Sequence, residues 1–458
     1  MPKKYHIHPK VTPLNLDYVF KFRIERGENC INCGKCTKVC IYEAHKRGKG
    51  GDPRKMADPN TIVCRNCFRC IQECPRGALE KSLDKDFLNI GGSYWKSDMF
   101  ITLWKQAEDG KVPVTGAGYR GPFTGPGFDS MWTDMSEIVR PTRDGIHGRE
   151  YISTSVELGR KLNHLTFDDC GKLLSKIHDT IDIPIPIIFD FPQDNLSHNV
   201  KTAIVRAAVE LNTCVVLSAD RIAADLKKYT KNIIPLISHK EIDKYQALVK
   251  SVRMAAIDYN DEVLSTLPAL QDKIKKINNV LTIVRVPATN AVEAIVSKLA
   301  QSGAEIIHVV ADYRGMEHGS SNADQRLAKD IIRAVHLKLV EERIRDEVTI
   351  IFSGGIAMAE HVPKAMICGA DLTAIDLPLL IALGARLYEE PEKILAFPEA
   401  LEKISVRTIM HRIVNLMGAM GIREARRLRG ETGRAIFFDE IDNDTFGKLF
   451  KKRESAKI

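Results

Sequence analysis

The chain has 458 residues, of which 44% are hydrophobic and 28% are charged, and its formal net charge is +8. This is the composition of a globular protein, and because no window approaches ~18 uninterrupted apolar residues we expect no membrane span of its own. The basic runs at 46–55, 423–434 and 451–453 lack interleaved aromatic residues, so we expect no nucleic acid partner. A solvated surface or a docking face for an acidic redox partner is the preferred interpretation.

Eight of the eleven cysteines fall in two copies of the pattern Cys-x2-Cys-x2-Cys-x3-Cys, the spacing at which a bacterial-type ferredoxin binds 4Fe–4S clusters. The first copy is Cys30, Cys33, Cys36 and Cys40, and the second is Cys64, Cys67, Cys70 and Cys74. In this pattern the fourth cysteine reaches the other cluster. We therefore predict one cluster on Cys30, Cys33, Cys36 and Cys74 and a second on Cys64, Cys67, Cys70 and Cys40.

Two other uses of the cysteines fit less well. Structural zinc sites usually take ligand pairs separated by a longer loop, and a disulfide framework is typical of a small secreted chain. This chain is long and shows no apolar signal segment over residues 1–10, and we expect a reducing, cytoplasmic compartment. The remaining cysteines, Cys170, Cys214 and Cys368, stand singly in apolar settings and are interpreted as small core residues.

The cysteine motifs and the composition divide the chain into four parts. Residues 1–90 are predicted to form a small α+β ferredoxin-like domain, and 91–150 a linker, because 110–129 is dense in glycine and proline. Residues 151–395 are predicted to form one large α/β domain, and 396–458 to hold C-terminal helices, at 399–417 and 422–429, and a basic tail.

The large domain alternates between strand-like and helix-like segments. Buried strands are predicted at 185–189, 214–217, 280–286, 306–310, 348–352 and 372–375, and helices at 200–211, 290–299, 324–343 and 359–366. Repeated βα units of this kind fit either a (β/α)8 barrel or a doubly wound sheet. In a barrel, the chemistry gathers at the carboxyl ends of the strands. The strand at 348–352 is followed by Ser353-Gly354-Gly355, whose backbone N–H groups could approach a phosphate, although a tight βα turn would need the same glycines.

Three segments resemble a known family. IIFSGGIAMAEHVPKAMICGADLTAIDLPLLIALGA, IIHVVADYRGMEHGSS and RTIMHRIVNLMGAMG are similar to the end of the FMN-binding barrel in the large subunit of glutamate synthase and to the helix that follows it. The resemblance implies a TIM barrel of the glutamate synthase type, an FMN, and electron transfer between flavin and iron–sulfur clusters.

The resemblance also implies flavin-binding residues. Ser353, Gly354 and Gly355 would bind the FMN phosphate, and Gly315 and Gly319 would lie near the ring or the ribityl chain. Arg285 and Arg314 would neutralise a phosphate or a reduced flavin. The alternative is that the glycines only form βα turns and the arginines lie on the surface or the rim of the core. His308, in an apolar strand, is interpreted as a satisfied structural histidine.

The chain departs from the family at several places. The family's cysteine cluster after the Ala-Leu-Gly helix is absent after Ala385, and no amidotransferase half with its nucleophilic cysteine is present. Asp376-Leu377-Pro378 stands where the family has a phosphate-binding Gly-Thr pair, and a carboxylate facing a phosphate would repel it unless Asp376 points away or a cation intervenes.

Three functions are therefore open. The first is an iron–sulfur flavoprotein oxidoreductase that passes electrons between two 4Fe–4S clusters and a barrel-bound FMN, with redox proteins or subunits of a larger electron-transfer complex as partners. The second is an ammonia-dependent glutamate synthase served by a separate glutaminase or an FAD-containing subunit. The third is a flavin-free barrel that acts as a scaffold for the ferredoxin domain in a larger redox complex.

Overall fold

The computed structural model describes residues 21–46, 56–60, 63–64, 66–92, 94–109, 127–133, 155–162, 164–175, 177–191, 196–319, 325–385 and 428–441. The chain forms two compact units. Residues 1–124 and 380–404 make the first, and residues 125–379 and 405–458 make the second. The predicted helices at 399–417 and 422–429 and the basic run at 46–55 lie almost entirely outside the described residues.

The first unit begins with a small module around the cysteine motifs. Strand β1 (Phe22–Arg26) pairs antiparallel with β2 (Leu79–Leu83), so that Arg26 lies opposite Leu79. Each cysteine motif forms one short helix, α1 (Lys35–Val39) and α2 (Arg69–Gln72). The buried core of the module is small and includes two of the motif cysteines: Ile24, Cys36, Met56, Cys70 and Leu79. The cysteines therefore supply part of the packing as well as the chemistry.

Two further helices follow the module, α3 (Lys85–Asn89) and α4 (Ser97–Asp109). Helix α4 lies inside the stretch that the sequence assigned to a linker, and it buries Met99, Phe100, Leu103 and Trp104. The assignment of 97–109 to a linker was wrong, because the glycine and proline residues that motivated it begin only at Gly110. An amphipathic apolar stripe should have indicated a helix there.

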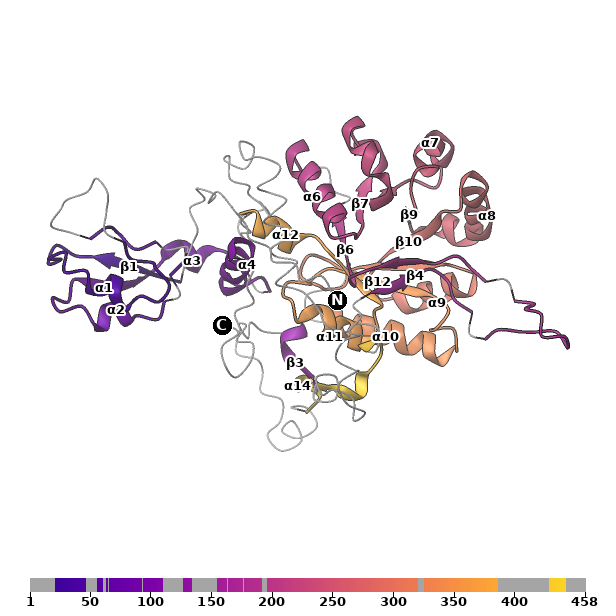
Figure 1. Ribbon diagram of the computed structural model, residues 1–458. Coiled ribbons are helices and arrows are strands. Elements are labelled where there is room, and N and C mark those ends of the chain that lie inside the picture. Colours follow the sequence, from indigo (N-terminus) through magenta and orange to yellow (C-terminus); the bar gives the residue numbers. More distant parts are fainter. Residues whose placement is uncertain are drawn as a thin grey trace. The chain divides into compact units, whose positions relative to one another are not determined.

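The second unit contains a closed barrel of eight parallel strands that follow one another in chain order (Figure 1). The strands are β6 (Ile187–Phe191), β7 (Val215–Ser218), β8 (Ile233–Leu236), β9 (Met254–Asp258), β10 (Leu281–Pro287), β11 (Ile306–Val310), β12 (Thr349–Ser353) and β13 (Leu372–Ile375). They are rich in β-branched residues and nearly continuous in burial, as parallel strands covered on both sides must be. The barrel decides between the two predicted architectures, and the doubly wound sheet is excluded.

Helices cover the outside of the barrel strands (Figure 1). They are α6 (His198–Glu210), α7 (Gln246–Val249), α8 (Asp261–Ile277), α9 (Val292–Gln301), α10 (Ala328–Glu341), α11 (His361–Cys368) and α12 (Leu377–Ala382), with 3-10 turns η3 (Ala219–Arg221), η4 (Ala224–Asn232) and η5 (Ile242–Tyr245). Helix α8 shows why such a segment starts where it does. The Asn260 side chain accepts a hydrogen bond from the Val263 N–H, and acidic residues in the first turn match the positive end of the helix dipole.

Smaller elements complete the second unit. Strands β4 (Val156–Leu158) and β5 (Ile181–Ile183) pair antiparallel, and the Gly159 backbone after β4 bonds the Thr349 hydroxyl at the start of β12. Strand β3 (Met131–Thr133), preceded by η1 (Gly127–Ser130), pairs antiparallel with β14 (Ala435–Phe437), which lies between η8 (Thr432–Arg434) and α14 (Phe438–Ile441). The β4–β5 pair therefore lies at the amino ends of the barrel strands, which leaves their carboxyl ends for other uses.

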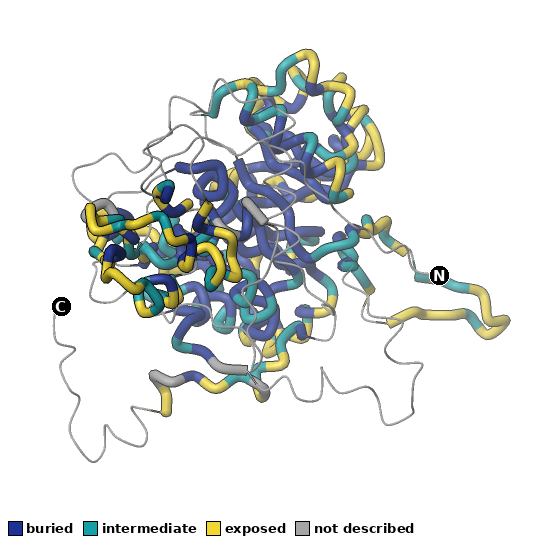
Figure 2. The backbone as a smooth tube through the Cα atoms, turned by 60° about the vertical axis from the view of Figure 1, so that its left-hand side comes forward, coloured by how far each residue is buried: buried dark blue, intermediate teal, exposed yellow. Residues whose placement is uncertain are grey.

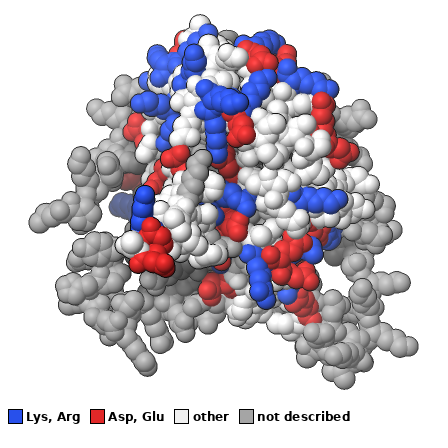
Figure 3. Space-filling view, turned by 90° about the vertical axis from the view of Figure 1, so that its right-hand side faces the viewer, with Lys and Arg blue, Asp and Glu red and all other residues white. Residues whose placement is uncertain are grey.

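Burial and surface charge follow the barrel. The strands are buried and the outer faces of the helices are exposed (Figure 2). On the face drawn in Figure 3, basic and acidic side chains lie side by side. Exposed ion pairs of the second unit include Lys240–Glu262, Lys244–Glu241 and Lys273–Asp243. Among the helices that the structure describes, none is both long and apolar enough to cross a membrane.

The predicted elements of the barrel agree with the structure within a few residues. Strands β11 and β13 have the predicted bounds, and the predicted 185–189 strand is displaced by two residues into β6. The prediction did not place strands β8 and β9 or helix α8. Cys214 and Cys368 are buried as expected, but Cys170 is exposed, so its assignment to the core was wrong.

Candidate functional sites

The structure brings together the cysteines that the motif spacing paired. Cys30, Cys33, Cys36 and Cys74 line one small pocket of the amino-terminal module. Cys70 lies close to the other three: burial and the neighbouring thiols of Cys64, Cys67 and, more weakly, Cys40 raise its pKa to about 11. Each group thus takes three sulfurs from one motif and the fourth from the other motif.

The backbone of the two motifs is wound in the same way. Asn32 and Asn66 both have positive φ, 53° and 52°, and so do Gly34 and Phe68 two residues further on, with φ 71° and 59°. After each motif another residue has positive φ, Glu43 at 56° and Gly77 at 60°, and the next N–H group points at sulfur: Ala44 N lies 3.3 Å from Cys40 Sγ and Ala78 N lies 3.3 Å from Cys74 Sγ. Such N–H···S bonds favour a thiolate, the form that binds iron.

The donor chemistry of the module fits two 4Fe–4S clusters. Each group supplies four thiols, and thiolate ligation is what such clusters require. Within the described residues, no three His, Cys, Asp or Glu side chains are grouped closely enough to hold a single metal ion. In a cubane each cysteine binds a different iron atom at a different corner.

A polar cluster occupies the carboxyl ends of four barrel strands. Arg285 of β10 donates from Nη2 to Asp190 Oδ2 of β6 at 2.9 Å. His308 Nε2 of β11 lies 2.9 Å from Ser353 Oγ at the end of β12 and 3.9 Å from Asp190 Oδ2. Asp190 and Arg285 are 6% exposed and His308 is fully buried. We call these four residues the barrel-floor cluster.

The barrel-floor cluster has polar atoms to spare. Asp190 Oδ1, Arg285 Nε and His308 Nδ1 are buried and have no hydrogen-bond partner among the described residues. His308 is therefore structural but only half satisfied, which corrects the prediction of a satisfied histidine. Burial and the Arg285 charge lower the pKa of His308 well below its usual value, so the ring is neutral. Burial raises the pKa of Asp190 even though Arg285 opposes it. Buried groups left unpaired in this way point to a missing ligand or water.

The glycines predicted to bind phosphate form a close junction of two loops. The position of a Cβ on Gly354 lies 2.5 Å from the Asp312 carbonyl oxygen, and that on Gly355 lies 2.7 Å from the Gly315 Cα. All three glycines have positive φ. The turn after β12 and the loop after β11 therefore meet through bare backbone, and any side chain there would separate them.

Two other predicted flavin residues lie differently. Gly319 has φ +82° and nothing within 4 Å of its Cβ position, so it borders open space. Arg314 is half-buried and is bound by its neighbour, with Nε 3.1 Å from Asp312 Oδ2. Of the two predicted arginines, only Arg285 reaches the barrel-floor cluster, because strand β10 aims it inward whereas Arg314 lies in a surface loop.

Asp376 follows β13 and turns its carboxylate toward the start of α12, where Oδ1 accepts the Leu377 N–H. Burial, with a further contribution from Asp190, raises its pKa to about 6. The carboxylate thus takes the backbone donor that a phosphate would take at this strand end. The unpartnered polar atoms of the barrel-floor cluster are chemically suited to a polar ligand such as a flavin ring, and among the described residues the turn after β12 is the candidate for its phosphate.

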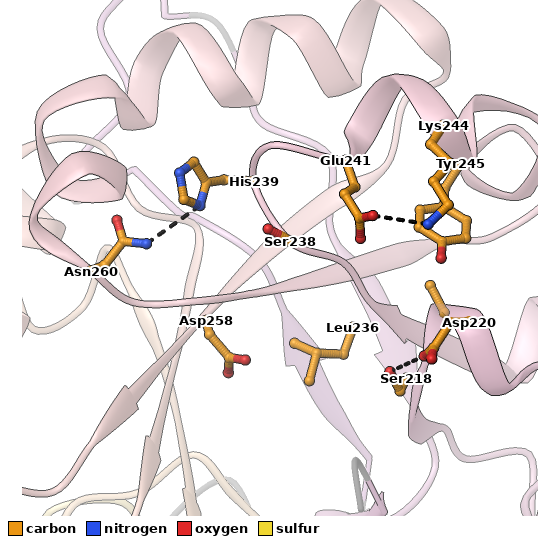
Figure 4. Close-up of a pocket in the computed structure, with 11 residues that line it drawn as sticks. Ser218, Asp220, Leu236, Ser238, His239, Glu241, Lys244, Tyr245, Asp258 and Asn260 are labelled. Atoms are coloured by element: carbon orange, nitrogen blue, oxygen red, sulfur yellow. Dashed lines mark hydrogen bonds and ion pairs between the residues drawn. The ribbon is translucent and has the colours of Figure 1, made fainter. Parts of the chain in front are cut away.

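An open cavity of about 460 Å³ lies at the carboxyl ends of β7, β8 and β9 (Figure 4). Three carboxylates line it, from Asp220, Glu241 and Asp258. Glu241 is paired with Lys244 at 2.8 Å, and Asp258 Oδ1 lies 3.7 Å from Arg285 Nη1. The remaining lining is Ser218, Ala219, Leu236, Ser238, His239, Tyr245 and Asn260. Asp258 therefore connects this cavity to the barrel-floor cluster.

The sequence did not single out Asp190, Asp258 or the cavity as a site. Asp258 ends strand β9, which was not predicted, and Asp190 lies in β6 one residue beyond the strand predicted at 185–189. The available signal was a polar residue at the end of an apolar strand. Such a residue indicates a binding site only once the strand is known to belong to a barrel, whose ligands bind at the carboxyl ends of the strands.

Comparisons with known proteins agree with this geometry. Residues 240–433 match the conserved region in glutamate synthase, and residues 29–79 match the 4Fe–4S dicluster domain. The chain is 26% identical to the archaeal-type glutamate synthase (NADPH) of Dehalococcoides mccartyi, over 81% of this chain and 82% of that protein. It is 25% identical to the archaeal glutamate synthase (NADPH) of Archaeoglobus fulgidus, over 93% of this chain and 96% of that protein. The predicted resemblance to glutamate synthase, the barrel and the 4Fe–4S dicluster domain are thereby confirmed.

Proposed function

We propose that this chain is an iron–sulfur flavoprotein oxidoreductase. Its residues 240–433 match the conserved region in glutamate synthase, and its residues 29–79 match the 4Fe–4S dicluster domain. The clusters exchange single electrons with a partner, and the barrel holds FMN. A bound FMN supplies the conversion between one-electron and two-electron chemistry. The observation that carries the proposal is the barrel-floor cluster, whose buried, unpartnered polar atoms lie at the strand ends where barrel enzymes bind their ligands.

The residues that would hold these groups follow from the geometry. The eight motif cysteines would ligate the clusters in the two groups described above. Ser353, Gly354 and Gly355 would meet the phosphate by backbone N–H groups, with Gly315 and Gly319 beside them. Arg285 would face the flavin from the floor. Arg314 has the weakest case, because Asp312 already binds it.

The floor residues have distinct tasks in this proposal. Asp190 holds the Arg285 guanidinium in place, so the charge beneath the ligand is fixed rather than mobile. His308 and Ser353 form a neutral hydrogen-bonded pair that fixes the Ser353 hydroxyl. Asp376, with a pKa of about 6, holds a proton on its carboxyl group in a large part of the molecules near pH 6.

Partners belong to the proposal as well. The relatives named above are described as NADPH-dependent glutamate synthases, and the described residues of this chain show no nucleotide fingerprint at a helix start. We therefore assign electron delivery to a separate redox protein or to a subunit of a larger complex, such as an FAD-containing subunit. A cytoplasmic location agrees with oxygen-sensitive clusters.

A second candidate is ammonia-dependent glutamate synthesis from 2-oxoglutarate, with a separate glutaminase. The names of relatives that match over four fifths or more of this chain favour it. The cavity at the ends of β7 to β9 gives it little support, because the cations beside its three carboxylates, Lys244, Arg221 and Arg285, already have those carboxylates as partners and are not free to bind a dicarboxylate substrate. Anaerobic assay with ammonia, 2-oxoglutarate and reduced ferredoxin distinguishes the two: glutamate formation supports the second candidate, and its absence from a flavin-loaded protein excludes it.

The principal test is cofactor content. The full chain, purified without oxygen, is expected to contain about eight irons and one FMN, released by mild acid. Eight irons without flavin, after incubation with excess FMN, would contradict the proposal and favour the flavin-free scaffold.

The phosphate position has its own test. FMN and riboflavin differ only by the phosphate, so their dissociation constants report whether Asp376 opposes it. Asp376→Asn is expected to tighten FMN binding about fivefold and to leave riboflavin binding unchanged, since it removes a charge worth roughly 1 kcal/mol near the phosphate. Asp220→Asn, at the end of β7, is the matched control and should change neither.

A further inference from the structure

Arg26, at the end of β1, points its guanidinium at two of the motif cysteines. Its Nη1 lies 3.6 Å from Cys30 Sγ and 4.0 Å from Cys36 Sγ. Its Nη2 donates to the Ala57 carbonyl oxygen at 3.0 Å and lies 3.3 Å from His45 Nδ1. The β1–β2 pairing fixes the backbone of Arg26, and the hydrogen bond to the Ala57 carbonyl fixes its guanidinium.

No carboxylate neutralises this arginine within the part of the chain that the structure describes. Its Nε is buried and has no partner there. Burial and the guanidinium itself lower the pKa of His45, so that neighbour is uncharged. Other cations of the same unit do have carboxylate partners: Arg23 pairs with Asp84, and Lys35 Nζ lies 3.1 Å from Glu73 Oε2. A shielded charge without a counter-ion is costly unless an anion lies beside it, and among the described residues the groups beside Arg26 that can carry a negative charge are the sulfurs of Cys30 and Cys36.

The second motif has a neutral residue at the equivalent position. Arg26 stands four residues before Cys30, and Asn60 stands four residues before Cys64. The contacts of the equivalent sulfurs differ accordingly: Cys30 Sγ faces the Arg26 guanidinium, whereas Cys64 Sγ lies 3.5 Å from the neutral Asn66 side chain, at Oδ1. The two cysteine groups therefore have different electrostatic surroundings although their spacing is the same.

We propose that Arg26 makes the two clusters unequal, by raising the reduction potential of the cluster held by Cys30, Cys33, Cys36 and Cys74 above that of the other. Reduction adds one electron to a cluster and no proton, so its negative charge increases by one. A fixed guanidinium that donates to the ligand sulfurs stabilises that added charge, and hydrogen bonds and net charge are known determinants of cluster potential.

The consequence is a direction for electron transfer within the module. An electron that enters on either cluster comes to rest on the one beside Arg26, and the cluster of Cys40, Cys64, Cys67 and Cys70 serves as the lower-potential station. This inference depends on the iron–sulfur half of the proposed function and is independent of whether the barrel binds FMN.

The test is a redox titration of the full-length protein, followed by electron paramagnetic resonance. Wild type is expected to show two one-electron steps that differ at least tenfold in equilibrium constant, which is 59 mV. Arg26→Gln should lower the higher midpoint by a comparable amount and leave the lower one in place. Arg26→Lys, which keeps the charge but not the forked donor, should produce a smaller shift. Arg23→Gln removes the same charge from the same strand and is expected to shift neither midpoint.

Several results would overturn the inference: a single unresolved step in wild type, unchanged midpoints in Arg26→Gln, a shift of the lower midpoint only, or an equal shift in Arg23→Gln. If Arg26→Gln does not retain eight irons, Arg26→Lys decides, and an unchanged higher midpoint in that variant rejects the inference. Iron content separates the two levels of failure. A wild-type chain without eight irons contradicts the proposed function, whereas a loaded chain with equal clusters contradicts only the role of Arg26.

Discussion

In the amino-terminal module the residues that carry the chemistry are also the core, whereas in the barrel the core and the polar site are separate. The module buries Cys36 and Cys70 together with three apolar side chains, and three more cysteines, Cys30, Cys64 and Cys74, pack against them. The barrel is filled by side chains of eight strands and the helices outside them, and its polar cluster lies at the carboxyl ends of those strands.

This difference teaches which part of the chain depends on its ligands. A module with so small an apolar core gains most of its stability from ligation, because metal binding free energy is then folding free energy. A barrel with a large buried core is stable without its ligand and can keep unpaired polar atoms at the site. The two units should therefore respond differently to loss of metal, loss of charge, and pH.

The largest expected effect is on the module when iron is removed. Chelation under reducing conditions should abolish amide protection over residues 21–84 and leave residues 187–375 protected, as measured by hydrogen exchange and mass spectrometry. Cys36→Ser should weaken protection of the module, while Cys170→Ser, at an exposed cysteine outside the motifs, should have no effect. A module that stays protected without iron would remove the contrast between the two units.

In the barrel, breaking the buried ion pair between Arg285 and Asp190 tests how much the free energy of unfolding depends on keeping these two charges together. Arg285→Leu leaves Asp190 buried and unpaired, and we expect a loss of about 3–5 kcal/mol in the free energy of unfolding measured with denaturant. The double variant Asp190→Leu, Arg285→Leu removes both charges and should recover most of that loss. A single variant within about 1 kcal/mol of wild type would show that water already compensates the charge.

Acidification should weaken the barrel through His336, which accepts a hydrogen bond from Arg345 Nε at 3.1 Å. Burial and the charges of Arg345 and Arg429 lower its pKa from 6.5 to about 4, against the opposing effect of Asp371 and Asp346. Its contribution is complete above pH 6.5, where both states are neutral, and is lost as the pH falls toward 4, because the unfolded state takes up a proton first. The loss is on the order of 3 kcal/mol.

The measurement is the free energy of unfolding between pH 7 and 4 for wild type and His336→Gln. The difference between the two curves isolates the histidine, since Asp376 acts with the opposite sign: its pKa is raised to about 6, and its contribution is lost as the pH rises from 3.8 through 6. Parallel curves for the two proteins would refute the assignment.

The smallest effect concerns the packing of the C-terminal segment on the barrel. Gly430 has φ +73°, and a Cβ there would lie 2.5 Å from Cε1 and Nε2 of His336. Gly430→Ala should cost about 2 kcal/mol, from backbone strain and the displaced ring. Gly433→Ala, where no atom lies within 4 Å, should change stability by less than about 0.5 kcal/mol. Equal effects at the two positions would mean that this segment does not pack on His336.

The sequence predicted the fold well where local pattern and tertiary role coincide. Strands β11 and β13 were located to the residue because apolar β-branched runs identify buried parallel strands. Strand β9, with two alanines in Met254–Asp258, lacks that signal, and α4 was hidden by the composition of its neighbours. Ser353, Gly354, Gly355 and Arg285 were singled out through family resemblance, and their role toward a flavin stays a prediction. Asp190 could not be found, because its partner Arg285 is 95 positions away.

The sequence by itself determined the cluster chemistry, because ligation of a cubane requires cysteines at fixed short spacing and that spacing is written in the chain. Only the tertiary structure decided which other side chains lie beside the cysteines. It shows that Arg26 faces Cys30 and Cys36, and that Asp376 turns to the start of α12. The physical reason is the range of the interactions. Ligand spacing is set within a few residues, whereas charge pairing and burial are set by strands that meet only when the β sheet closes.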